Sequence, residues 1–144
     1  MKYQLGLVQI NVTDRKKAEE FYVHTLGFKK ILVDPLTGIE SGGDNDNGPF
    51  FLDSGCGFPI LLYPLNIKKG VQFDYPNQTG VILVIYMDDI DKTYRDWRAK
   101  GVEFIKIAWS EEESGIAGCP FGRFIAVRDP FGNVFEILQP FKHK

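Results

Sequence analysis

The sequence contains few residues of the types that carry metal or covalent chemistry. Its 144 residues include two histidines, His24 and His143, and two cysteines, Cys56 and Cys119. The cysteines lack the CxxC spacing of a zinc or redox motif, and they are too few for a disulfide framework. We therefore expect ordinary thiols in a reducing cytoplasm, and no Ser-His-Asp or Cys-His catalytic set is indicated.

Long apolar runs and a large excess of one charge are also absent. No segment approaches the roughly 20 apolar residues that a membrane-spanning helix requires. Gln9 and Asn11 interrupt the apolar start of the chain, which favours a strand over a signal peptide. The formal net charge is -2, and the basic residues form no stripe. These features indicate neither a membrane nor a nucleic-acid partner, and the acidic run at 111–113 is typical of a solvated loop.

The composition, with 44% apolar and 25% charged residues, is ordinary for a globular protein. Residues 1–144 fit one domain, in which the same order of elements occurs twice. Each half predicts a strand, a helix that follows an aspartate N-cap, and three further strands. We expect strands at 5–12, 28–33, 50–52 and 58–63 in the first half, and at 81–87, 102–107, 123–127 and 134–138 in the second.

Matching residues at a nearly fixed offset support the repeat. The pattern Ile10-x-Val12-x-Asp14 returns 75 residues later as Ile85-x-Met87-x-Asp89. The pattern Leu62-Tyr63-Pro64 corresponds to Leu138-Gln139-Pro140 at an offset of 76. The sequence therefore predicts two β-α-β-β-β modules, at 1–67 and 80–140, joined by a linker.

Several motifs give the chain a resemblance to a known family. They are Ile10-Asn11-Val12-Thr13-Asp14, Phe21-Tyr22, Leu26-Gly27-Phe28, Pro120-Phe121-Gly122-Arg123 and Arg128-Asp129-Pro130-Phe131-Gly132-Asn133-Val134-Phe135-Glu136. Through them the chain resembles the vicinal oxygen chelate superfamily, which holds glyoxalase I, bleomycin-resistance proteins, fosfomycin-resistance enzymes and extradiol dioxygenases. The resemblance implies an α+β fold in which two βαβββ modules form an open-barrel cup, and it implies a homodimer.

Strand alternation predicts which side chains would face that cup. On the last strand, Glu136 lies on the face opposite to Phe135 and Ile137. The residues expected to face the cup are Leu7, Gln9, Asn11, Ile82, Val84, Tyr86 and Glu136. One carboxylate is thus expected on a largely apolar surface.

The resemblance also implies where a metal would be held. Members that use a metal take ligands from four strand positions, which correspond here to Leu7, Ile82, Glu136 and Ile60, the residue 76 positions before Glu136. Three of these four side chains are aliphatic and have no nitrogen, oxygen or sulfur donor. We therefore expect no metal ligands and no cofactor.

An apolar cup with a few polar groups is typical of a small-molecule pocket. Trp109 and Phe121, on either side of the acidic loop, could form an aromatic rim that stacks on a planar or cationic ligand, or Trp109 could close one end of the barrel. The predicted ligand-binding residues are Leu7, Gln9, Ile60, Ile82, Tyr86, Trp109, Phe121, Arg123 and Glu136.

Glu136 itself has three interpretations. A buried carboxylate requires a partner, and Arg123 on the neighbouring strand is the first candidate, with Arg128 the second. Glu136 could instead bind a cationic ligand, or it could be a general base whose pKa is raised by apolar walls. The sequence leaves these three roles open.

Two functions are compatible with these features. The first is a metal-free protein of the bleomycin-resistance type that binds a small organic molecule. The alternative is a lyase, isomerase or dioxygenase of the same superfamily that uses Glu136 and a divalent metal. Fold alone does not separate them.

Overall fold

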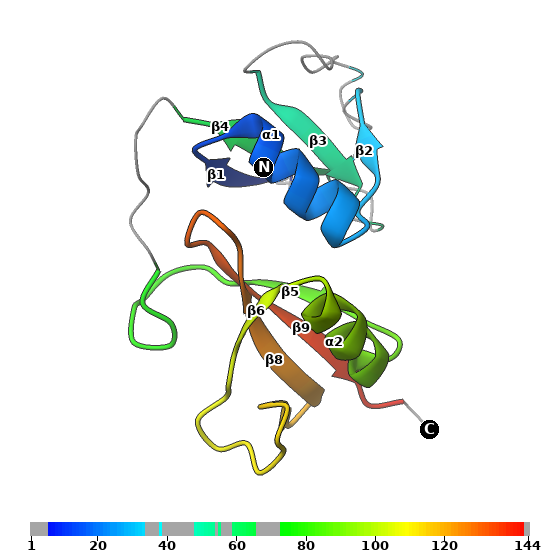
Figure 1. Cartoon of the computed structure of the whole chain (residues 1–144), viewed down its shortest axis with the longest axis vertical. Helices are drawn as coiled ribbons and strands as arrows, with labels where there is room; N and C mark the ends of the chain where they lie inside the picture. The colour runs from blue at the N-terminus through cyan, green and yellow to red at the C-terminus, as the bar shows by residue number, and fades with distance from the viewer. Residues whose placement is uncertain are drawn as a thin grey trace, which may run out of the picture. The chain divides into compact units, whose positions relative to one another are not determined.

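The chain forms two units, Met1–Gly70 and Val71–Lys144. In the first unit, a helical segment lies on one face of a four-stranded sheet (Figure 1). The structure is a computed structural model that describes residues 6–33, 38, 48–53, 55, 59–65 and 73–142. Both units follow the predicted order of a strand, a helix and further strands.

The elements of the first unit are β1 (Val8–Val12), α1 (Arg15–Glu19), the π-helical η1 (Glu20–Thr25), β2 (Lys30–Ile31), β3 (Phe50–Asp53) and β4 (Pro59–Pro64). The helix begins where the sequence predicts, because the Asp14 side chain accepts a hydrogen bond from the Lys17 amide at 3.1 Å. The continuous helical segment formed by α1 and η1 ends before Gly27, whose φ of +85° suits the residue that follows a helix C-terminus. The sheet order is β1-β4-β3-β2, with β1 parallel to β4.

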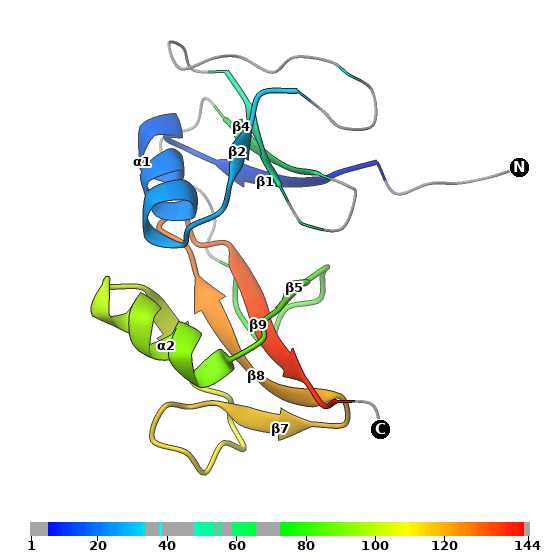
Figure 2. The same ribbon diagram turned by 90° about the vertical axis from the view of Figure 1, so that its right-hand side faces the viewer.

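The second unit contains β5 (Leu83–Tyr86), α2 (Ile90–Ala99), β6 (Glu103–Ile105), β7 (Ala117–Cys119), β8 (Gly122–Arg128) and β9 (Val134–Pro140). Its sheet order is β5-β9-β8-β6, and β7 also pairs with β8. Asp89 begins α2 by accepting a hydrogen bond from the Lys92 amide at 3.0 Å. Figure 2 shows α2 along one face of this sheet.

The core of the second unit lies between α2 and the sheet. Ile90 and Trp97 of α2 are buried, as are Ile125, Phe135 and Ile137 of β8 and β9. Burial of each large apolar side chain contributes about 1.5–3 kcal/mol to folding. The odd-numbered residues of β9 thus face the helix, which leaves the even-numbered residues on the opposite face.

The turn at Asp129, which the sequence singles out, fixes the start of β9. Asp129 is 3% exposed, and its Oδ1 accepts hydrogen bonds from the backbone amides of Phe131 and Asn133 at 2.9 and 2.8 Å. The Asn133 side-chain amide donates to Asp129 Oδ2 at 2.8 Å. These hydrogen bonds to the buried Asp129 carboxylate give the Asp-Pro-Phe-Gly-Asn motif a structural role, which is to hold the turn before β9.

The differences from the predicted elements are local. β7 was not predicted, because the three residues Ala-Gly-Cys show no alternation of apolar and polar side chains. The strands predicted at 28–33 and 102–107 are confined to Lys30–Ile31 and Glu103–Ile105. Over the described ranges, no helix has the length and hydrophobicity that a membrane span requires.

Candidate functional site

Glu136 lies on the face of the second sheet that is turned away from α2. Its neighbours on β9, Phe135 and Ile137, are 2% and 0% exposed on the helix side, whereas Glu136 is partly exposed. The register partners of Glu136 are Val84 on β5 and Ala126 on β8. Because register partners share a face, Val84 and Glu136 lie side by side, as alternation predicted.

The Glu136 carboxylate has a partner that the sequence did not reveal. The Tyr75 hydroxyl donates a hydrogen bond to Glu136 Oε2 at 2.7 Å. Burial of the phenol, reinforced by this bond to a carboxylate, raises the pKa of Tyr75, so the hydroxyl remains a donor at neutral pH. The segment before β5 that carries Tyr75 is anchored by Phe73, whose amide donates to the Gly132 carbonyl at 3.1 Å. Arg128, the second candidate partner, donates from Nη1 to the Phe73 carbonyl at 3.0 Å.

The predicted pairing of Glu136 with Arg123 is wrong. Arg123 pairs in register with Gln139, so its side chain lies on the α2 side of the sheet. There the guanidinium donates to both carboxylate oxygens of Asp91, at 2.8 and 3.1 Å, and to Glu112 at 2.7 Å. Position 126 lies opposite Glu136, whereas position 123 is three residues away on the same strand and therefore lies on the opposite face of the sheet.

An apolar cluster occupies the same face as Glu136. Its buried members are Ile107, Ala117, Phe124, Ala126 and Leu138, and Tyr75, Ile105, Cys119 and Val134 pack against it. Tyr75 therefore contacts the cluster as well as the carboxylate. Cys119 is a free, partly buried thiol, and Cys56 lies outside the described residues.

Three exposed aromatic side chains lie on or beside this part of the second unit. Trp109, Phe121 and Tyr86 are 63%, 68% and 69% exposed. The Trp109 indole NH donates to the Gly118 carbonyl at 3.0 Å, and its ring centroid is 5.8 Å from that of Phe124 in the cluster. Tyr86 is the register partner of Leu138 in the same cluster.

The remaining predicted positions belong to the starts of the two units. Leu7 precedes β1 and Gln9 lies on it, and both are exposed. Gln9 donates to Asn11 Oδ1 at 2.8 Å. Ile82 lies just before β5 and is partly buried. The ligand-binding roles of these residues stay predictions.

Ile60 does not share a face with Gln9, contrary to the prediction. It is 3% exposed and pairs with Val8 on the buried face of β4 and β1. The register partner of Gln9 is Leu61, just as the register partner of Val84 is Glu136. The offset of 76 was therefore one residue too long for the last strands, and a shift of one residue places a side chain on the opposite face.

This correction leaves the expected donor set unchanged, because Leu61 offers no more metal-binding atoms than Ile60 does. Among the described residues, no three His, Cys, Asp or Glu side chains are grouped so that they could hold a metal ion. His24 is exposed on η1, and His143 lies outside the described residues. The described residues around Glu136 therefore do not fit a divalent metal site.

Residues 4–137 match the model of one protein family, the Glyoxalase/Bleomycin resistance protein/Dioxygenase superfamily. The chain belongs to this superfamily. The predicted α+β fold, with a β-α-β-β-β order in each half, is confirmed by the structure together with its structural relatives.

One relative in sequence and two in structure illustrate the range of this superfamily. The uncharacterized protein YetH of Bacillus subtilis is 26% identical over 136 residues, which cover 94% of this chain and 98% of YetH. The antibiotic binding protein TnmS3 from Streptomyces sp. CB03234 is 22% identical, with a TM-score of 0.64 over 97% of this chain and 98% of TnmS3. A mutant of the fosfomycin resistance protein FosX of Listeria monocytogenes, solved with Mn(II) and 1S,2S-dihydroxypropylphosphonic acid, is 18% identical, with a TM-score of 0.64 over 98% of this chain and 93% of FosX. These structural matches show a shared fold, and the site itself has to indicate the function.

Proposed function

We propose that the protein binds a small organic molecule on the Glu136 face of its second unit, without a catalytic metal. The observation that carries this proposal is the 2.7 Å hydrogen bond from Tyr75 to Glu136. A protonated phenol is a neutral donor, which orients the carboxylate without cancelling its charge. Glu136 is thereby an oriented acceptor beside an apolar cluster, an arrangement common in small-molecule sites.

The strand neighbours of Glu136 favour ligand binding over metal chemistry. The side chains of Val84 and Ala126, on either side of it, have no atom that could bind a metal ion. One carboxylate and one neutral phenol are a poor ligand set for a divalent ion. The antibiotic-binding activity named for TnmS3 supports ligand binding by this fold, while the residues around Glu136 argue for it in this chain.

The same geometry indicates which ligands would suit the site. Within the described part of the chain, Tyr75 is the hydrogen-bond partner of Glu136, so Oε1 can accept a further bond from a ligand. A protonated amine or another N–H group would meet this requirement. The apolar body of the ligand would contact the partly buried side chains that pack against the cluster, with Tyr86 and Trp109 as the exposed aromatic contacts.

Metal analysis and a ligand screen test this function together. We expect protein purified without chelators to contain metal far below one equivalent per chain. We also expect fragments with an amine and an aromatic ring to shift the NMR signals of Val84 and Ala126. Stoichiometric metal whose removal abolishes a measurable reaction would overturn the proposal in favour of the enzymatic alternative, and a screen without binders to this face would also overturn it.

We further propose that the protein is a cytoplasmic homodimer. The free thiol of Cys119 supports a reducing compartment, and the superfamily resemblance supports the dimer. Sedimentation velocity should give twice the 16.4 kDa chain mass, and cell fractionation should recover the protein with cytoplasmic markers. A monomer at all concentrations would contradict the homodimer, and recovery of the protein in another cell fraction would contradict the cytoplasmic location.

A further inference from the structure

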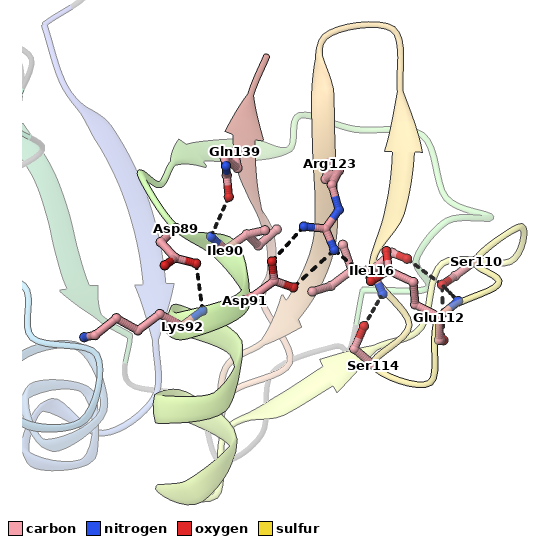
Figure 3. A network of polar contacts seen from close by, with 10 residues as sticks. All are labelled: Asp89, Ile90, Asp91, Lys92, Ser110, Glu112, Ser114, Ile116, Arg123 and Gln139. Atoms are coloured by element: carbon pink, nitrogen blue, oxygen red, sulfur yellow. Dashed lines mark hydrogen bonds and ion pairs between the residues drawn. The ribbon is translucent and has the colours of Figure 1, made fainter. Parts of the chain in front are cut away.

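A network of charged side chains connects α2, β8 and the loop after β6 (Figure 3). By strand alternation it lies on the face of the second sheet opposite to Glu136. Arg123 on β8 donates two hydrogen bonds, of 2.8 and 3.1 Å, to the carboxylate of Asp91 in the first turn of α2. Its Nη2 also donates to Glu112 at 2.7 Å, in the loop between β6 and β7. One guanidinium therefore connects the helix and this loop to β8.

The loop that carries Glu112, residues 108–116, is also ordered by its own contacts. Ser110 Oγ donates to the Ile116 carbonyl at 2.5 Å and accepts from the Glu112 amide at 3.1 Å. Gly115 has a φ of +91°, and a Cβ added there would lie 2.9 Å from the Lys106 Cα. The loop is thus held in one close-packed conformation.

Trp109 lies at the start of this loop, directly before Ser110. Its indole NH is bonded to the Gly118 carbonyl, its ring packs near Phe124, and 63% of the residue is exposed. Phe124 belongs to the Glu136 face, whereas the adjacent Arg123 belongs to the α2 face. The loop therefore links the ion pairs of Arg123 on one side of the sheet to an exposed aromatic ring, Trp109, on the other.

We propose that Arg123, with Asp91 and Glu112, forms a positioning clamp that holds Trp109 as a preformed stacking surface for a planar ring system. This inference rests on the proposed function, because it assigns one wall of the same ligand site. A ring that is already fixed loses less conformational entropy on binding than a mobile one, so the clamp strengthens binding without touching the ligand.

The charges around Trp109 favour planar cations among planar rings. Glu111 and Glu113, two and four residues after Trp109 in the same loop, are exposed, while Arg123 is paired with Asp91 and Glu112. A cation over an indole ring is attracted by the negative face of the ring, and nearby carboxylates add to this attraction. We therefore choose 1-methylquinolinium, a planar cation, as the probe.

The experiment follows the indole NH signals of the two tryptophans by NMR while the probe is added. A W109F variant assigns the signals, and Trp97, which is buried in the core, provides an internal reference. In the wild-type protein the probe should shift the Trp109 signal. In D91N and E112Q, the Trp109 NH should exchange faster with solvent, and the Kd of the probe should rise about threefold to tenfold.

K92Q is the matched control, because Lys92 forms an ion pair with Asp96 at 3.1 Å on the same helix, outside the clamp. It should leave Trp109 exchange and the Kd unchanged. Wild-type exchange and Kd in both D91N and E112Q would overturn the clamp. The stacking surface would be overturned if the probe left the wild-type Trp109 signal in place. Fragment binding beside Val84 with an unresponsive Trp109 would overturn this inference and leave the proposed function standing.

Discussion

The Tyr75 hydroxyl lies 2.7 Å from Glu136 Oε2, although 61 positions separate the two residues in the sequence. The phenol comes from the segment before β5, and the carboxylate comes from the last strand of the same unit. At the position where the superfamily resemblance implies a metal ligand, this chain therefore holds its carboxylate with a neutral hydroxyl.

Removing that hydroxyl should destabilise the second unit. In Y75F, the Glu136 carboxylate loses its donor, and we expect the free energy of unfolding to fall by about 1–3 kcal/mol. Urea denaturation measures this change. Y94F is the control, because the Tyr94 hydroxyl is exposed and accepts from Arg98 at 2.8 Å, so its loss should be within about 0.5 kcal/mol. Equal losses in the two variants would show that the Tyr75 bond contributes no more than a surface contact.

Tyr75 should be among the last tyrosines to ionise as the pH rises. Its pKa is raised in the folded protein, mainly by burial and then by the bond to Glu136, while an unfolded tyrosine ionises near pH 10. Below that pH both states are protonated and the contribution of Tyr75 to stability is fully present; above it the unfolded state ionises first, so this contribution is lost progressively. Tyrosinate absorbance at 295 nm should show a late step that is missing in Y75F. A titration of Y75F that keeps the late step would refute this assignment.

Glu136 should discriminate between ligands by charge. E136Q keeps an acceptor for Tyr75 but removes the negative charge, so binding of 1-naphthylmethylammonium should weaken about tenfold. Binding of the neutral 1-naphthalenemethanol, which has nearly the same shape, should change by less than about twofold. Calorimetric titration gives both constants, and E20Q, at an exposed position on η1, serves as the control variant. If the two ligands weaken equally in E136Q, Glu136 does not recognise charge.

The register of β4 can be tested with two adjacent residues. Ile60 is 3% exposed in the core, so I60A should lower the free energy of unfolding by about 2–5 kcal/mol. Leu61 is partly exposed on the other face, so L61A should cause a smaller loss. Chemical denaturation of the two variants compares them directly. A larger loss for L61A would support the offset of 76 and contradict the pairing of Ile60 with Val8.

Local signals in the sequence were sufficient for much of the fold. Asp14 and Asp89 cap the helices that they were expected to begin, because an aspartate satisfies free backbone amides wherever a helix starts. Alternation along β9 correctly separated Glu136 from Phe135 and Ile137, because strand geometry has a period of two. These features depend on residues close together in the chain.

Contacts between distant segments could not be read in this way. A one-residue error in the offset placed Ile60 on the wrong face, and proximity of strands suggested Arg123 as the partner of Glu136. Both errors have one cause: the register between strands depends on hydrogen bonding across the sheet, and a single-residue shift moves every side chain to the other face.

The sequence by itself determined the repeated order of elements, the superfamily and the scarcity of metal-binding side chains, because these depend on local pattern and residue type. Only the tertiary structure decided that Tyr75 binds Glu136, that Arg123 binds Asp91 and Glu112, and that Leu61 takes the place expected for Ile60. Such pairings follow from how segments far apart in the chain are aligned in space, and local pattern does not encode that alignment.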